Sequence, residues 1–346
     1  MRRNLIKALL IVFCISFFHL FGVSPAPSQE AGLKAGGFQW GGDIELGYRF
    51  TDIDGSKDRY KYVTNLQSGL KLFDFTLWGK RIEEDSKSLV DSLRFNVSNL
   101  GDPYSSAQLQ IKKNMTYDLK MTYKEYQYIN YREDANVFSG NQFSFDTKIR
   151  RGSLLLSLFP KDGVKVNLGY NLIQRGGDAA APRVGYLDPM AQDIREQVNE
   201  YFVSAEFPLS GWDLFIKQSI WNYSNRNKIH APVYEDRDES VWTYVSTLKG
   251  HTQFGERWDF DAAYIYAHSE GDADLQTNCP GCPGKGNTNF NTHVVEAGLS
   301  YLLQKGLIFH LDYRFHALDQ DGTSYVVGSP DISPTASSSF PCFAQI

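Results

Sequence analysis

Histidine is the side chain most often used for acid–base catalysis and metal binding near neutral pH, and this 346-residue chain scatters its histidines. Six of the seven lie between residues 230 and 316. His310 and His316 share one face of a predicted strand, but six residues at about 3.3 Å each place them roughly 20 Å apart. Neither a G-x-S-x-G nor an H-E-x-x-H motif occurs. We therefore expect no catalytic site, no metal site and no bound cofactor in this chain.

The cysteines predict a disulfide rather than a cofactor site. Cys279 and Cys282 enclose two residues in 279-CPGC-282, and such a pair can close a small loop in an oxidising compartment. A haem-attachment motif needs histidine directly after the second cysteine, and Pro283 stands there. A zinc site needs further ligands nearby, and none is evident. We therefore expect a loop disulfide between Cys279 and Cys282.

Paired aspartates recur in segments that we expect to be loops. The pairs are 52-DID-54, 272-DAD-274 and 319-DQD-321, and glycine follows the first and the last. A D-x-D-G loop can bind Ca²⁺ through its carboxylate oxygens. Asp-Gly is equally a common turn sequence, so calcium binding and simple turn formation both stay open.

The elements that position these residues are strands. In 38-FQWGGDIELGYRF-50 the even positions are mostly apolar and the odd positions carry Gln39, Asp43, Glu45 and Arg49. This alternation lasts about thirteen residues, longer than a soluble strand of about 5–6 residues and long enough to cross a bilayer, which takes about 9–11 tilted residues. About thirteen such runs follow one another as far as residue 317. The sequence therefore predicts an all-β protein, an antiparallel transmembrane β-barrel with about 13–14 visible strands.

Two local irregularities are predicted within this pattern. The alternation of 66-LQSGLKLFDFTLWGK-80 breaks at Leu72-Phe73, where we expect a β-bulge. The segment 188-DPMAQDIREQVNE-200 could form one short helix within a loop.

The polar positions of the strands predict the character of the barrel interior. They carry both signs of charge, which a packed sandwich core could not bury but which suits water or a polar protein inside the barrel. The predicted lumen-facing residues are Asp43, Glu45, Arg49, Lys165, Asn167, Asp259, Asp261, Asp312 and Arg314.

The connections between runs differ in length according to their position in the chain. From the fifth run onward they alternate between long ones (130–148, 174–199, 222–240 and 268–293) and short ones such as 160-PKDG-163 and 304-QKG-306. Outer-membrane barrels have short periplasmic turns and long extracellular loops. The alternation therefore places the protein in the bacterial outer membrane, surrounded by lipid.

The two ends of the chain lie outside the predicted barrel, which spans 38–328. Basic residues, an apolar run and small residues follow one another at the N-terminus, as in a secretory signal peptide. We expect residues 1–26 to form it, with cleavage between 26 and 31 and a short periplasmic segment at 27–37; a permanent membrane anchor is the alternative. The net charge of −5 provides no basic surface for nucleic acid.

The last part of the chain does not look like a barrel strand. Residues 329–346 are rich in serine and proline, and the number of runs before them is odd, whereas bacterial single-chain barrels have an even number of strands. We expect a truncated piece of a larger barrel with a non-barrel or frameshifted tail. A miscount of one strand between residues 53 and 100 is the alternative.

Several segments resemble the MtrB/PioB family of decahaem-associated outer-membrane barrels. They are 68-SGLKLFDFTLWGK-80, 93-LRFNVSNLGDPYSSAQLQIKK-113, 121-MTYKEYQYINY-131 and 145-FDTKIRRGSLLLSLFPKDGVKVNLGY-170. The resemblance covers roughly residues 40–175. It implies a barrel that encloses a periplasmic multihaem c-type cytochrome and lets electrons cross the outer membrane, with no redox centre in the barrel itself. A water-filled porin for small polar solutes is the alternative that the residues leave open.

Overall fold

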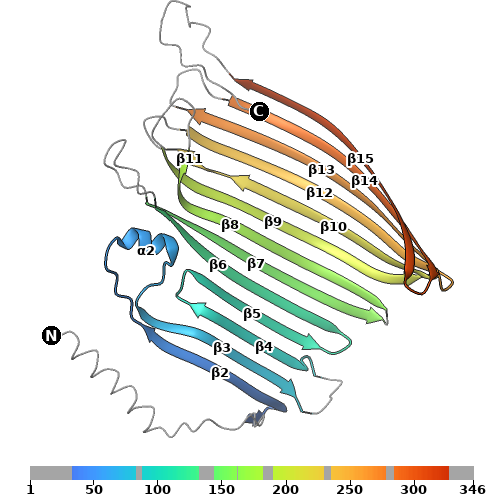
Figure 1. Ribbon diagram of the computed structural model, residues 1–346, viewed down its shortest axis with the longest axis horizontal. Helices are drawn as coiled ribbons and strands as arrows, with labels where there is room; N and C mark the ends of the chain where they lie inside the picture. Colours follow the sequence, from blue (N-terminus) through green and yellow to red (C-terminus); the bar gives the residue numbers. More distant parts are fainter. Residues whose placement is uncertain are drawn as a thin grey trace, which may run out of the picture.

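Figure 1 shows the computed structural model, which describes residues 33–82, 88–131, 144–161, 163–181, 190–229, 235–277 and 284–326. Its elements in chain order are β1 (Leu33–Ala35), β2 (Phe38–Arg49), α2 (Lys57–Val63), β3 (Gly69–Arg81), β4 (Ser92–Leu100), β5 (Tyr104–Lys113), β6 (Tyr117–Tyr131), β7 (Ser144–Lys161), β8 (Val164–Ala181), β9 (Met190–Leu209), β10 (Trp212–Asn225), β11 (Lys228–Ile229), β12 (Glu235–Phe254), β13 (Trp258–Thr277), β14 (Gly284–Gln304) and β15 (Leu307–Val326). The predicted signal peptide and the tail at 329–346 lie outside the described residues.

All strands belong to one antiparallel sheet in which neighbours in sequence are neighbours in space. The order runs from β1 to β15 without a crossover, and only the short β11 leaves the path, pairing with β9 and β12. Within the described residues β15 pairs with β14 alone, so the wall is open between its first and last strands. Figure 1 shows these strands at opposite margins of the curved sheet.

The predicted strands are confirmed. Each of the thirteen alternating runs corresponds to one strand, β2–β10 and β12–β15, because the two-residue period places one set of side chains on each face. The predicted bulge is also found. Glu45 pairs with Asp74 and Leu46 with Leu72, which leaves Phe73 as the extra residue of β3.

The short helix predicted within 188–200 is wrong. Residues 190–200 belong to β9, whose first half pairs with β8 and with β11; Gln192 and Asp193, for example, face Ile229 and Lys228. Its apolar residues Met190, Ile194 and Val198 recur every fourth position, a spacing that fits one face of a helix as well as one face of a strand. Backbone hydrogen bonds from β8 and β11 then determine the extended conformation of this segment. These bonds come from distant parts of the chain and cannot be inferred from the segment's own residues.

The long connections are much shorter than predicted, because most of their residues extend the strands. The segment 268–293, for example, is strand except for 278–283, which lies outside the described residues. Strands β12, β13 and β15 reach 20 residues each, roughly 66 Å at 3.3 Å per residue. Their outer halves lose the alternation because both faces meet water there. The same extension places Asp272, Asp274, Asp319 and Asp321 in strands and not in loops.

Helix α2 was not predicted and occupies the connection between β2 and β3. The Ser56 side chain caps its N-terminus by accepting a hydrogen bond from the Arg59 backbone N–H at 3.3 Å, which satisfies a donor that has no partner inside the helix. The helix contacts β6. In the part of the chain that the structure describes, no helix has the length and apolar character to cross a membrane.

The sheet has one apolar face, and that face is exposed. Among the described residues, the buried hydrophobic ones are Ile194, Ile229 and Val294, too few to form a core. Large apolar side chains such as Leu168, Val203 and Leu311 are exposed instead, along one side of the wall. An apolar surface of this extent requires an apolar environment, as the outer surface of a membrane barrel does.

Two rows of aromatic side chains limit this apolar face. The ring centres of Tyr170 and Tyr201 lie 5.0 Å apart, with the rings tilted, in the upper row, which continues across the ladder to Tyr244. The lower row includes Trp258, packed on Tyr301 at 4.3 Å, and Phe254, its partner in the ladder. Ten residues separate Tyr244 from Phe254 in β12, about 33 Å along the strand. At a tilt of about 45° this gives roughly the 25 Å band of transmembrane barrels between their aromatic girdles.

Gly79→Val is expected to lower the free energy of unfolding by about 1–3 kcal/mol, the usual cost of overpacking. A Cβ atom at Gly79 would lie 2.6 Å from the ring of Trp40, so the indole must move and release its hydrogen bond to the Ala35 carbonyl. Urea titration of the protein in lipid vesicles measures the loss, and faster amide exchange in β1 should accompany it. Gly152→Val is the control, since its Cβ meets nothing closer than 3.7 Å.

Candidate functional site: the polar face of the sheet

The nine predicted lumen-facing residues share one face of the sheet, called the polar face below. Two cross-strand rows connect them. The first row crosses the sheet from β8 to β15 through successive ladder partners, namely Lys165, Glu206, Phe215, Lys249, Ala263, Glu296 and Arg314. The second row crosses the sheet from β8 back to β2 through the ladder partners Asn167, Ser157, Asp118, Lys112, Ser92, Lys80 and Gln39. Alternation along β2, β13 and β15 then places Asp43, Glu45, Arg49, Asp259, Asp261 and Asp312 on the same face. That this face lines a lumen remains our prediction.

Buried polar side chains bond to one another in the centre of the polar face. The Ser157 hydroxyl donates to Asn167 Oδ1 at 2.7 Å, and Asn167 Nδ2 donates to Ser204 Oγ at 3.1 Å. Because buried polar groups are costly when unpaired, this chain of bonds fixes three strands in register. It also leaves these groups no capacity for chemistry.

Glu200 is a second centre of this network and was missed by the sequence analysis. Its two carboxylate oxygens accept from Asn171 Nδ2 at 2.7 Å and from Lys217 Nζ at 2.9 Å. The Lys217 ammonium also lies 4.5 Å from the centre of the Phe202 ring, a cation–π contact. Glu200 is therefore a paired, buried charge that strengthens the wall.

The other predicted residues have partners of the same kind where the register provides them. Lys165 Nζ lies 3.1 Å from Glu206 Oε1, and Arg314 Nε lies 3.2 Å from Glu296 Oε1. Asp261 and Asp312 are separated in the ladder by Gly298, so the structure does not pair them. The nine residues share one face of the sheet, but their partners depend on the register between strands, which a single sequence does not show.

A buried ionic cluster lies where β2 and β3 meet the turn between β4 and β5. Asp102 Oδ1 lies 2.5 Å from Arg49 Nη1 and 3.0 Å from Lys71 Nζ, and Lys71 also donates to the Gly101 carbonyl at 2.7 Å. Burial alone would raise the pKa of the Asp102 carboxyl, but hydrogen bonds and charges from Arg49 and Lys71 outweigh it and lower that pKa. Asp102 is not among the residues that the sequence analysis selected, since nothing in Gly-Asp-Pro-Tyr marks its carboxylate as buried.

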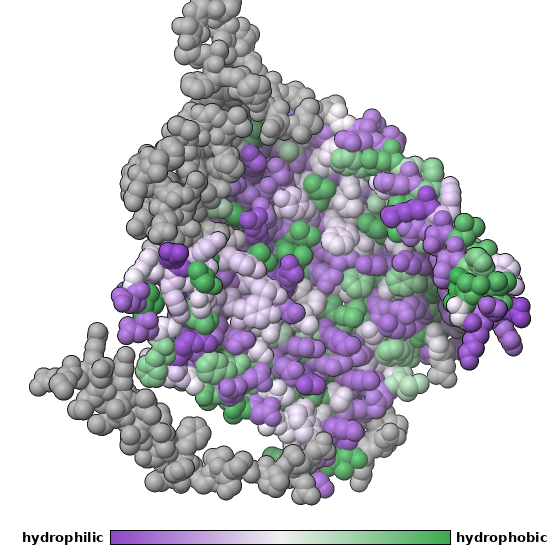
Figure 2. Space-filling view, viewed as in Figure 1, coloured by the Kyte–Doolittle hydropathy of each residue, from purple (hydrophilic) through white to green (hydrophobic). Residues whose placement is uncertain are grey.

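An apolar groove interrupts the polar face between β9, β10 and β12. It has a volume of about 420 Å³, and its apolar lining is Val198, Trp221, Tyr223, Val241 and Val245. The Trp221 indole donates to Ser219 Oγ at 3.1 Å, which fixes the ring, yet 37% of the residue is exposed. Figure 2 shows hydrophobic residues dispersed among hydrophilic ones on the visible side of the molecule. A fixed, exposed aromatic surface of this kind can bind an apolar group but performs no reaction.

The remaining candidates from the sequence form no further site. Cys279 and Cys282 lie outside the described residues, so their predicted disulfide stays a prediction. Across the described ranges, no group of three or more His, Cys, Asp or Glu side chains is arranged to hold a metal ion. His310 Nδ1 lies 2.8 Å from Ser300 Oγ, which gives this histidine a partner within the wall.

The fold and its two unlike faces define the class: this chain is the antiparallel wall of a transmembrane β-barrel. No family model and no curated protein matches the sequence. Similar solved structures include the ferric yersiniabactin uptake receptor FyuA from Yersinia pestis, at 10% identity and a TM-score of 0.46, with 67% of this chain and 49% of that chain covered. The outer membrane protein OmpT of Vibrio cholerae is similar at 10% identity and a TM-score of 0.25, with 85% and 99% covered. This chain spans about half the length of the receptor, and these values are too low to transfer a function.

Proposed function

We propose that the chain is an outer-membrane barrel wall whose polar face holds a protein inside the barrel. The observation that carries the proposal is the apolar groove around Trp221. A water-filled pore gains nothing from an exposed indole, whereas an inserted protein would bury it, and buried aromatic anchors dominate the binding energy of protein interfaces. The exposed apolar face and its aromatic rows support the membrane location.

The occupant that we propose is a periplasmic multihaem c-type cytochrome, through which electrons would cross the outer membrane. This identity rests on the resemblance of residues 40–175 to the MtrB/PioB family. The wall would contribute insulation and support, and the haems of the occupant would contribute all of the redox chemistry.

A water-filled porin is the second candidate, and one observation favours it. The charges in the centre of the polar face already pair within the wall, as Lys217 does with Glu200 and Lys165 with Glu206. A wall with satisfied charges needs no partner to be stable. Its polar residues would then line a path for small polar solutes.

Purification from the native outer membrane separates the two functions. An enclosed cytochrome predicts a haem Soret band that stays with the barrel through chromatography. Trp221→Gln should reduce that retained haem at least about tenfold, because interface anchors are worth about 2 kcal/mol or more. Phe215→Gln, on the same strand and face but outside the groove, should retain it. A barrel without Soret absorbance that conducts ions in planar bilayers would be a porin.

A further inference from the structure

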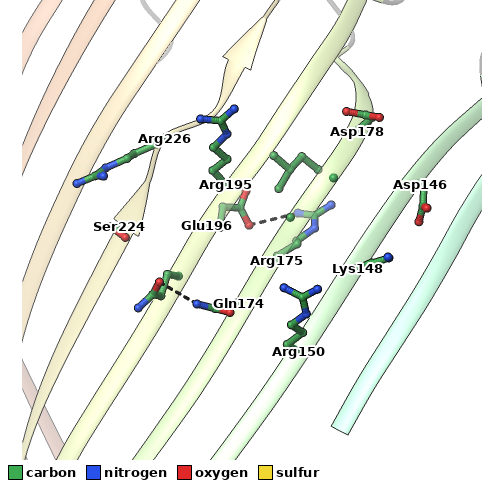
Figure 3. A pocket seen from close by; sticks show the side chains of 14 residues that line it. Asp146, Lys148, Arg150, Gln174, Arg175, Asp178, Arg195, Glu196, Ser224 and Arg226 are labelled. Carbon is green, nitrogen blue, oxygen red and sulfur yellow. Dashed lines mark hydrogen bonds and ion pairs between the residues drawn. The ribbon is translucent and has the colours of Figure 1, made fainter. Parts of the chain in front are cut away.

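A cavity of about 800 Å³ lies where the upper parts of β7, β8 and β9 meet the end of β10. Figure 3 shows the cationic side chains of Arg150, Arg195 and Arg226 around it, with Lys148 nearby and Asp146 and Asp178 at its edge. Among all of its lining residues, five side chains are cationic and three are acidic. The function proposed above makes no use of this cavity.

The register places the cavity on the outer side of the wall, above the apolar band. Lys148, Gly176 and Arg195 are successive partners across β7, β8 and β9. Gly176 lies six residues beyond Tyr170 in β8 and on the same face, so it stands about 20 Å further along the strand than the upper aromatic row. At the tilt of barrel strands this is the level of lipid headgroups and sugars, not of acyl chains.

Glycine forms the floor of the cavity. Gly176 and Gly177 are consecutive, and Gly177 has φ +122, a conformation that side chains rarely adopt. A Cβ atom at Gly177 would also lie 1.9 Å from the Asp146 carbonyl oxygen. Glycine is therefore required at 177 by the neighbouring backbone. At Gly176 a Cβ atom would meet nothing closer than the Ile194 carbonyl oxygen at 3.6 Å, so a ligand can approach the backbone of β8 there.

The cations around this floor keep donors available for a ligand. Arg150 Nε lies 2.9 Å from Glu125 Oε2, and the guanidinium also interacts with the Tyr123 hydroxyl. Its five N–H donors exceed these two contacts. Arg195 and Arg226 have loose partners, Asp193 at 3.7 Å and Asp238 at 3.8 Å. Guanidinium groups bind phosphate through two parallel hydrogen bonds, so three of them beside a lysine form a phosphate-binding arrangement.

Acceptors at the edge of the cavity indicate what else the ligand carries. The Asp178 carboxylate is exposed, and Asp146 Oδ1 has no hydrogen-bond donor among the described residues. Carboxylates bind hydroxyl and ammonium donors, which a bare phosphate ion lacks. On the same face and near this height, β13 carries Asp272 and Asp274, and Lys285 of β14 pairs with Asp274 at 3.7 Å. The excess of cations among these described strands therefore lies on β7–β10.

We propose that this cavity binds a phosphate monoester carried on a sugar. The arginines and Lys148 take the phosphate, and the aspartates take sugar hydroxyls or an amino group. Its position beside the headgroup level makes a phosphorylated glycolipid of the outer leaflet one source of this chemistry, and a soluble sugar phosphate is the other. The assignment does not depend on what occupies the polar face.

The test uses the full chain in nanodiscs that contain either phosphorylated lipid A or its dephosphorylated form. Wild-type protein should bind the phosphorylated lipid at least about tenfold more tightly, the effect of losing charge-assisted hydrogen bonds. Glucosamine phosphate is then added as a soluble competitor. Displacement of the lipid at millimolar concentrations assigns the cavity to a free sugar phosphate, and lack of displacement assigns it to the lipid; either result supports the phosphate site.

Variants decide whether the cavity is responsible for this binding. Arg195→Gln combined with Lys148→Gln should remove the preference for phosphate, and Arg195→Lys should retain part of it. Lys285→Gln combined with Lys305→Gln removes the same charge elsewhere and should leave the preference intact. Heat-modifiable migration on gels verifies that each variant is folded. Equal binding by the cavity variant and the wild type, or no preference for phosphorylated lipid in the wild type, would overturn the proposal.

Discussion

Ala262→Arg is expected to destabilise the protein in a bilayer by about 2–4 kcal/mol, whereas Ala263→Arg, one residue further along β13, should be nearly neutral. The two positions differ only in the face on which they lie. Ala262 pairs with Gly250 and Ala297 on the apolar face, between the two aromatic rows. An arginine on the lipid side of a barrel costs about 2–4 kcal/mol near the bilayer midplane.

Ala263 has polar-face neighbours that accommodate the same arginine. It pairs with Lys249 and with Glu296, and the glutamate can compensate the new charge. Urea titrations of both variants in vesicles of one lipid give the free energies of unfolding. Equal losses, or a larger loss for Ala263→Arg, would contradict the assignment of the two faces.

Asp102→Asn should lower the free energy of unfolding by about 3–5 kcal/mol, the usual effect of removing one partner from a buried ion pair. The carboxylate interacts with Arg49 and Lys71, and the side chains of Lys71 and Asp102 are only 7% and 5% exposed. The substitution leaves Lys71 buried with a neutral partner. Asp238→Asn is the matched control, because its carboxylate is 65% exposed and lies 3.8 Å from Arg226; exposed pairs contribute about 0–1 kcal/mol.

The stability that the Asp102 carboxylate contributes should decrease as the pH is lowered. Because its pKa is lower in the folded protein than in the unfolded chain, the carboxylate contributes its full stability above the unfolded pKa of about 3.9. That contribution is lost as the pH falls through the lower, folded pKa. Wild type and Asp102→Asn should therefore differ most near neutral pH and converge in strong acid. A difference that persists unchanged in strong acid would show that the carboxylate charge is not its source.

The sequence contains enough information for the strand array because alternation is a local property. Within the lipid band, the alternation of apolar and polar residues in each run shows which residues lie on which face. Even the bulge at Phe73 appears as a break in this alternation. The nine polar positions follow from the same period. Where strands leave the lipid, as in β9 before residue 200, polar residues occur on both faces and the alternation is interrupted. The predicted strand ends and the helix at 188–200 failed for that reason.

The partners of the polar residues could not be predicted, because they depend on contacts between distant parts of the chain. Asp102 is 53 residues from Arg49, and Glu200 meets Asn171 only through the register of β8 and β9. The groove around Trp221 combines three strands in the same way. Each strand contributes an ordinary apolar residue, and only their juxtaposition forms a surface.

The height of the wall has a consequence for anything that passes along its polar face. Strands of 20 residues, about 66 Å in length, extend to roughly twice the distance between the aromatic rows. The strands thus form a rigid collar above the bilayer, across the depth at which outer-leaflet sugars lie. Under either proposed function, whatever crosses along the polar face would therefore leave the wall well above the level of the lipid headgroups.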